Sequence, residues 1–259
     1  MVLKYLILNP LIGFVLGARQ VMFILAKTLL TCLKGPHRPR DVLNHMNTIG
    51  CGSLPIIAIS TAFAGFVVTG ELAHQMDTAL HTVEMLPGFS GQFVFRELGI
   101  VIPALLLVSK VGAATTAEVG SMKVTEQIDA LRLLQIDPVE YLVYPRFVAS
   151  IVVIACLTLI SIFVTLSAAI AVAVLRYNFS IAEYVNALAH FVSGKDVVCA
   201  LVKGMTFGAV MPIISCFYGF NCGGGAEGVG SATTNSVVTS TIIVIVLDFL
   251  LTFAFSMVL

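Results

Sequence analysis

The chain has 259 residues, of which 58% are hydrophobic and 11% charged, and its formal net charge is zero. A soluble domain has about 25% charged residues, so this composition indicates an all-α integral membrane protein without a sizeable soluble domain. The balanced charge gives no indication of a nucleic-acid partner. Because about 20 apolar residues cross a bilayer, we expect an N-terminal helix followed by five transmembrane helices.

Residues 1–45 are the first predicted unit, and residues 46–259 are the predicted transmembrane domain. The charged residues of the first unit are Lys4, Arg19, Lys27, Lys34, Arg38 and Arg40, against Asp41 alone. By the positive-inside rule, this excess of cations places the N-terminus in the cytoplasm. Arg19 and Lys27 interrupt the apolar stretch, which favours a helix in the membrane interface over a span. Whether residues 5–30 span the membrane stays open at this point.

Five long apolar stretches follow, and each predicts a transmembrane helix. They lie at about 47–70, 91–113, 147–175, 197–220 and 235–258. The connection at 71–92 has acidic residues but neither Lys nor Arg, as expected for an outer loop, and residues 176–196 form the second outer connection. Five spans that start from a cytoplasmic N-terminus leave the C-terminus on the outer side.

The segment between the second and third spans carries many charged residues. Ionised groups are costly to bury in hydrocarbon, so this segment lies in water or at the bilayer surface. Residues 123–134 have helical periodicity, with Val124, Ile128 and Leu131 on one face, which predicts a short amphipathic helix. The sequence Asp-Pro-Val-Glu from Asp137 is typical of a helix start. The pattern fits a docking helix and a surface helix covering the span ends equally well.

Charged residues inside the predicted spans are candidate binding residues. Arg96 and Glu97 are adjacent in the second span. Neighbours on a helix point about 100° apart, so each should face another helix, a second subunit or a water-filled cavity. An anchor at the outer edge of the span is the alternative. Lys203 lies near the end of the fourth span, where it is expected to snorkel, whereas Asp248 lies deeper in the fifth and is expected to be paired.

The sequence has no pattern for enzymatic chemistry or for a cofactor. The run from Gly223 to Gly228 formally matches G-x-G-x-x-G, but no strand precedes it, so we interpret it as a tight inner loop between the last two spans. The chain has no G-x-x-x-x-G-K-[ST] loop for ATP phosphates. Its His and Cys residues lack metal-ligand spacing, so we expect neither a catalytic residue nor a metal site.

Four separated blocks of the sequence resemble the MlaE/YrbE family of lipid-transport ABC permeases. They are E-L-G-I-V-I-P-A-L-L from Glu97, V-G-A-A-T-T-A-E-V-G-S-M-K-V-T-E-Q-I-D-A-L from Val111, D-P-V-E-Y-L-V-Y-P-R from Asp137 and G-G-A-E-G-V-G-S-A-T-T from Gly224. The blocks occur in the family's order, and the resemblance covers roughly residue 44 to the C-terminus. Two positions depart from the family pattern: Lys110 replaces an expected Arg, and Ser231 replaces a common basic residue.

The resemblance implies a permease subunit of an ATP-driven transporter that moves phospholipids between inner and outer membranes together with an MCE-type lipid-binding protein. It further implies a homodimer, two copies of a separate ATPase, and a location in the bacterial inner membrane with the C-terminus in the periplasm. A stand-alone secondary transporter or channel is the alternative, although the sequence has no convincing internal repeat.

The resemblance also implies two functional regions. In the family, the charged segment carries a coupling helix that docks on the ATPase, and the lipid cavity lies between the two permease copies. The candidate ATPase-coupling residues here are Glu118, Lys123, Glu126, Gln127, Asp129 and Arg132. The candidate lipid-binding residues are Arg96, Glu97, Leu98 and Val101.

Overall fold

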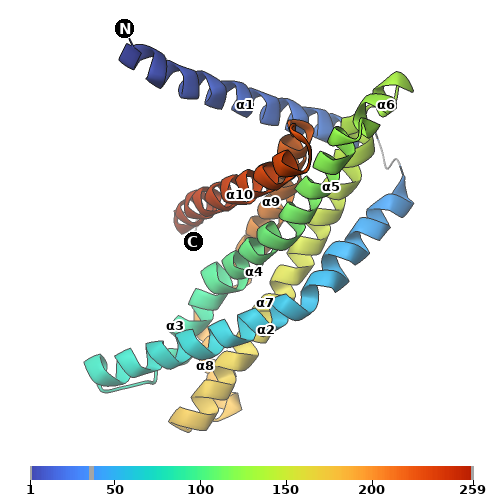
Figure 1. Ribbon diagram of the computed structural model, residues 1–259. Coiled ribbons are helices and arrows are strands. Elements are labelled where there is room, and N and C mark those ends of the chain that lie inside the picture. The colour runs from blue at the N-terminus through green and yellow to red at the C-terminus, as the bar shows by residue number, and fades with distance from the viewer. Residues whose placement is uncertain (1, 35–37, 258–259) are drawn as a thin grey trace.

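The computed structural model describes residues 2–34 and 38–257, with side chains described for residues 15–34, 38–79 and 81–257. Within these ranges the fold consists of helices and contains no strand (Figure 1). The α-helices are α1 (Val2–Leu33), α2 (Pro39–Leu80), α3 (Leu86–Phe93), α4 (Gly99–Leu107), α5 (Ala113–Val124), α6 (Gln127–Leu133), α7 (Tyr144–Tyr177), α8 (Ile181–Phe191), α9 (Gly194–Phe220) and α10 (Gly225–Ser256). Three π-helical segments connect some of them: η1 (Val94–Leu98), η2 (Val108–Gly112) and η3 (Val139–Val143). The prediction of an all-α membrane protein is confirmed.

Six stretches of the described chain are long and apolar enough to cross a membrane: 15–33, 39–79, 86–124, 139–177, 194–220 and 225–256. The last five coincide with the predicted spans but extend beyond them. The prediction of a loop at 71–92 was wrong, because α2 continues to Leu80 and α3 begins at Leu86. Residues 71–80 are rich in good helix formers such as Ala, Leu, Gln and Met, which explains why the helix continues past the apolar stretch. The second predicted connection, at 176–196, likewise contains α8.

Helix α1 crosses one end of the bundle, near α6, instead of running alongside the other long helices (Figure 1). It packs on α9 and η3, with Ile24 and Thr28 buried. Large apolar side chains such as Phe23, Leu30 and Leu33 stay exposed on it. This arrangement suits a helix that lies along the membrane surface, although its length and composition would also allow a span.

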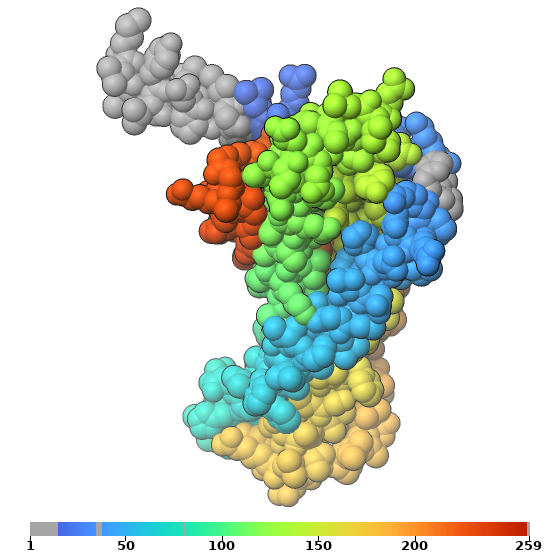
Figure 2. All heavy atoms as spheres, turned by 45° about the vertical axis from the view of Figure 1, so that its right-hand side comes forward, coloured from blue at the N-terminus to red at the C-terminus, as the bar shows by residue number. Residues whose placement is uncertain are grey.

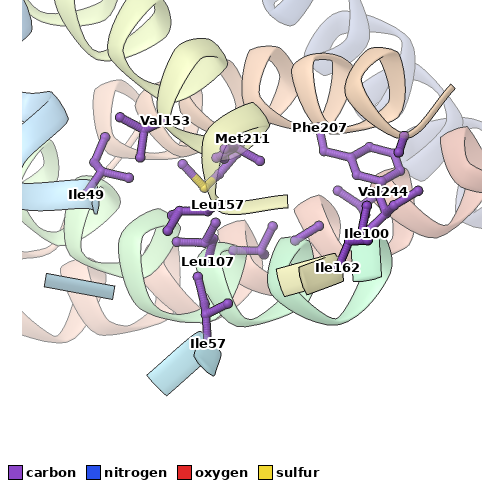
Figure 3. Packing of buried hydrophobic residues seen from close by; sticks show 14 of the residues in the cluster. Ile49, Ile57, Ile100, Leu107, Val153, Leu157, Ile162, Phe207, Met211 and Val244 are labelled. Carbon is purple, nitrogen blue, oxygen red and sulfur yellow. The ribbon is translucent and has the colours of Figure 1, made fainter. Parts of the chain in front are cut away.

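Helix α7 lies between α2 and α9 and makes extensive contacts with both. The main core cluster contains Ile57, Leu107, Leu157 and Met211, which come from four different helices (Figure 3). Small residues allow the backbones to approach closely. A Cβ atom added at Gly208 of α9 would lie 2.7 Å from the carbonyl oxygen of Ser150 in α7. Small residues at this contact therefore permit close packing of α7 and α9.

Replacing Gly208 by Ala should destabilise the fold, because the new methyl group would overlap the backbone of α7. Overpacking of this kind costs about 1–3 kcal/mol, so the melting midpoint in detergent should fall. The matched control is Gly230→Ala in α10, where an added Cβ meets no neighbouring atom within 4 Å. Ala is the better helix former, so this control should melt at the same or a higher temperature. Equal melting of the two variants would contradict the close approach of α7 and α9.

The helical path from Leu86 to Val124 is interrupted twice by π-helical segments, η1 and η2. A π turn inserts one residue into the helical repeat, which rotates the side chains that follow it. Arg96 and Glu97 lie in η1, and Lys110 lies in η2. The sequence pattern did not predict these segments, although such turns are frequent at functional sites.

The predicted amphipathic helix over 123–134 was wrong as a single element. Helix α5 ends at Val124 and α6 begins at Gln127, because Glu126 adopts a left-handed conformation with φ 60°. The predicted apolar face is split: Ile128 is fully buried, whereas Val124 is exposed. The helix start at Asp137 is confirmed, since its Oδ1 accepts a hydrogen bond from the backbone N–H of Val139 at 3.0 Å.

Candidate functional site

Arg96 and Glu97 turn to different partners, as expected for neighbours on a helix. The Nε of Arg96 donates to Oδ1 of Asp196 at 2.9 Å. Asp196 is buried at the start of α9, where its Oδ2 also accepts hydrogen bonds from the backbone N–H and the hydroxyl of Ser193. The Arg96 side chain stays 41% exposed, so its guanidinium is held in position yet remains accessible.

Lys203 of α9 is the centre of a second group of contacts. Its Nζ donates to Asp248 of α10 at 2.8 Å, to Thr252 at 2.7 Å and to the carbonyl oxygen of Arg96 at 2.8 Å. Oε1 of Glu97 lies 3.3 Å from the same nitrogen. The expected pairing of Asp248 is therefore confirmed, whereas the expected snorkelling of Lys203 was wrong, because these acceptors satisfy the ammonium inside the fold.

We call Arg96, Glu97, Asp196, Lys203 and Asp248 the ion cluster. It joins η1, α9 and α10, which are distant in sequence, and its formal charges are two positive and three negative. Asp196 was not among the predicted site residues, because the sequence places it in the second predicted outer connection. The run from Ser193 to Asp196 forms a capping box at the start of α9, and that pattern could have identified Asp196 as a residue at the end of a span.

A small hollow lies beside the ion cluster. Its lining consists of Phe95, Arg96, Ile100, Cys199, Lys203, Thr252, Phe255 and Ser256. Among the four candidate lipid-binding residues, Arg96 lines this hollow directly. Glu97 contacts Lys203, which lines the hollow, and Leu98 packs against the main core cluster. Val101 is half-buried in α4 and does not belong to the lining. An apolar wall with one accessible cation can hold an amphiphile that carries an anionic group.

Five of the six candidate coupling residues, all except Glu118, lie at the other end of the molecule, around the turn between α5 and α6 (Figure 1). Glu126 and Gln127 are exposed at this turn. Asp129 accepts from Lys123 at 2.8 Å and from Arg132 at 3.3 Å. The hydrogen bond from Lys123 holds the pKa of Asp129 below its usual value, so this carboxylate stays ionised at neutral pH.

Glu118 does not belong to that turn. It pairs with Arg146 of α7 at 2.8 Å, and Arg146 is almost completely buried. A further contact that the sequence did not predict is the ion pair between Lys27 of α1 and Asp137. Helix α1 is thereby tied to the segment that follows α6.

The short connection between α9 and α10 contains Gly224, and α10 begins at Gly225, both with positive φ. The interpretation of the run from Gly223 to Gly228 as a tight loop was therefore right only for Gly223 and Gly224, because residues 225–228 form the first turn of α10. Within the described part of the chain, no group of three or more His, Cys, Asp and Glu side chains could hold a metal ion.

The family described as "Permease MlaE" matches residues 42–254, which include the ion cluster and the α5–α6 turn. A probable ABC transporter permease protein of Rickettsia felis is 37% identical over 216 residues, or 82% of this chain and 81% of that protein. The probable ABC transporter permease protein slr1045 of Synechocystis is 34% identical over 229 residues, or 88% and 87% of the two chains. The chloroplastic protein TRIGALACTOSYLDIACYLGLYCEROL 1 of Arabidopsis thaliana is 32% identical over 232 residues, or 90% of this chain and 66% of that protein.

Proposed function

Because the chain belongs to the MlaE permease family and is a multi-pass ABC transporter permease, we propose that it moves phospholipids between the bacterial inner and outer membranes. The observation that supports this substrate is the half-exposed guanidinium of Arg96 at an otherwise largely apolar hollow. A phospholipid combines an anionic phosphate with long acyl chains, and therefore complements both parts of this lining.

In this proposal Arg96, Glu97, Leu98 and Val101 border a lipid cavity between two copies of the chain. Helix α10 supports the homodimer, because only one stripe of it is buried within the chain and the rest of its surface is free to meet a second copy. The buried stripe consists of Ala232, Ser236, Ser240 and Val244. Large apolar side chains elsewhere on α10, among them Ile242, Ile245 and Phe249, stay exposed. Such a face needs contact with lipid or with a second protein surface.

The energy source in this proposal is a separate ATPase, present in two copies and docked at the α5–α6 turn through Lys123, Glu126, Gln127, Asp129 and Arg132, with Glu118 of α5 as a further contact. Leu133 and Leu134 support a docking role, since they follow the charged residues and are 86% and 70% exposed. Exposed leucines at a helix end can insert into a groove of a partner protein.

The orientation follows from the cations of residues 1–45, which favour a cytoplasmic N-terminus and hence a periplasmic C-terminus in the inner membrane. An MCE-type lipid-binding protein would then meet the end formed by α3 and α8, opposite α6 (Figure 1). Exposed apolar residues at that end, including Met85, Phe89 and Phe191, would be available for the contact.

A photocrosslinker at Leu98 or Val101 should capture phospholipid in cells more strongly than one at Ile160, an exposed position in the middle of α7. The physical reason is that a bound lipid stays beside its site longer than a bilayer lipid stays beside a bare helix. Equal labelling at the three positions would indicate general bilayer contact and would contradict the cavity. Co-purification with the ATPase and lipid-stimulated ATP hydrolysis would separate this function from a stand-alone transporter or channel.

A further inference from the structure

A second hollow lies between α2, the η2–α5 segment and the start of α7, near the end of the molecule that carries α6. Its polar lining includes His45, Thr48, Ser53, Lys110, Arg146 and Ser150. Figure 2 shows α2 in blue and α5 in green at this end, with yellow-green atoms of the chain around the start of α7 visible between them. None of its lining residues belongs to the ion cluster.

Two buried hydroxyl groups in this hollow have no hydrogen-bond partner in the described part of the chain. They belong to Ser53 and Ser150, and each residue is only 1% exposed. Buried hydroxyls normally find a partner, often the carbonyl four residues earlier, as Thr158 of α7 does. Ser161, Ser215 and Ser240 are also buried without a partner in this part of the chain, but only Ser53 and Ser150 line this hollow, so a polar group placed in it could accept hydrogen bonds from both once their side chains rotate toward it.

The charge of the lining favours an anion. The ammonium of Lys110 contacts the carbonyl oxygen of Gly52, and the guanidinium of Arg146 donates to the carbonyl of Leu142 at 3.1 Å. Glu118 is the carboxylate of this lining, and it pairs with Arg146 from a side chain that is 58% exposed. With two cations and one carboxylate, the lining has a formal net charge of +1. The ammonium and the guanidinium also have N–H groups that these contacts do not use, and these remain available to an anion.

A phosphate group fits this set of donors. It offers several acceptor oxygens in a tetrahedral arrangement, so the ammonium, the guanidinium and two serine hydroxyls could all donate to one group. The position of the hollow along α2 also favours a lipid head group. Helix α2 has 42 residues and is therefore about 63 Å long, roughly twice the thickness of a hydrocarbon core. His45 to Ser53 thus lie near one boundary of that core, at the level of lipid head groups.

We propose that this hollow binds a phosphate group, supplied by the head group of a phospholipid in the membrane leaflet on the α6 side. Lys110 and Arg146 hold the anion, and Ser53 and Ser150 donate their hydroxyl protons to it. The lipid source rests on the proposed function, whereas the phosphate chemistry rests on these residues alone. Along the helix, Lys110 lies 14 residues after Arg96, or about 21 Å, so the site is separate from the cavity beside the ion cluster.

The test uses the full chain in nanodiscs of phosphatidylglycerol, with a photocrosslinker at Thr48, which lines the hollow, or at Asn47, an exposed neighbour outside the lining. Phospholipid capture should be greater at 48 than at 47. Lys110→Gln should reduce the capture about tenfold, since a charged hydrogen bond is lost. Lys110→Arg should retain it. The matched control is Lys195→Gln, which removes an exposed lysine at the start of α9.

Inorganic phosphate separates the two sources of the anion. If phosphate alone raises the melting midpoint of the wild type but not of Lys110→Gln, while no lipid is captured at position 48, the site takes free phosphate. If Lys110→Gln and Ser150→Ala both leave lipid capture and the phosphate effect at the wild-type level, the proposal is overturned. Lipid capture at Val101 and lipid-stimulated ATP hydrolysis test the proposed function independently, so failure of one is distinguishable from failure of the other.

Discussion

Replacing Lys203 by Met should produce a large loss of stability. Lys203 is 2% exposed and is the cation shared by Glu97 and Asp248. Without it, two carboxylates face each other inside the bundle with no compensating charge. Breaking a buried ion pair by removing one partner costs about 3–5 kcal/mol, so the melting midpoint in detergent should fall by several degrees.

Lys195→Met is the control for this substitution, because it makes the same chemical change at an exposed position of the same helix. It should melt as the wild type does. A second variant, Lys203→Met combined with Asp248→Leu, should recover part of the loss, since replacing a whole buried pair by apolar groups is often nearly neutral. If Lys203→Met alone melts at the wild-type temperature, the ion cluster does not stabilise the fold.

Local sequence patterns predicted much of the fold. Apolar stretches gave the five predicted spans, because a helix is the simplest way for a chain to satisfy its backbone hydrogen bonds in lipid. The helix start at Asp137 was predicted from its own neighbours, and the pairing of Asp248 followed from the cost of an isolated buried charge. Each of these inferences depends on residues close together in sequence or on a general energetic penalty.

Features that depend on distant residues were not predictable in the same way. The burial of Lys203 depends on acceptors from η1 and α10, which lie far from it along the chain. Arg146 belongs by sequence to the charged segment, yet it is buried against Glu118 of α5. The helix break at Glu126 was not predictable from the sequence either. The helical periodicity of 123–134 continues across this residue, although its backbone conformation is left-handed.

Reversing the charges of Glu126 and Asp129 to Lys should abolish association with the ATPase while the permease stays folded in the membrane. Glu126 is exposed at the left-handed turn, and Asp129 accepts from Lys123 and Arg132 nearby. The double substitution therefore turns a surface of mixed charge into a cationic one. Such a surface should repel a partner whose charges complement Glu126 and Asp129 of the wild type. Because these side chains lie at the surface, the melting midpoint should change little.

The matched control reverses Glu71 and Asp77 to Lys, which adds the same charge on exposed residues of α2, near the opposite end of the molecule. That variant should retain the ATPase in a pull-down from solubilised membranes. A complementary variant, Leu133→Ser with Leu134→Ser, removes the exposed leucines without changing the charge and should also weaken the association. If the Glu126 and Asp129 variant still retains its ATPase at the wild-type level, the α5–α6 turn is not the coupling surface, and loss of ATPase in the α2 control would point to a general effect of added charge.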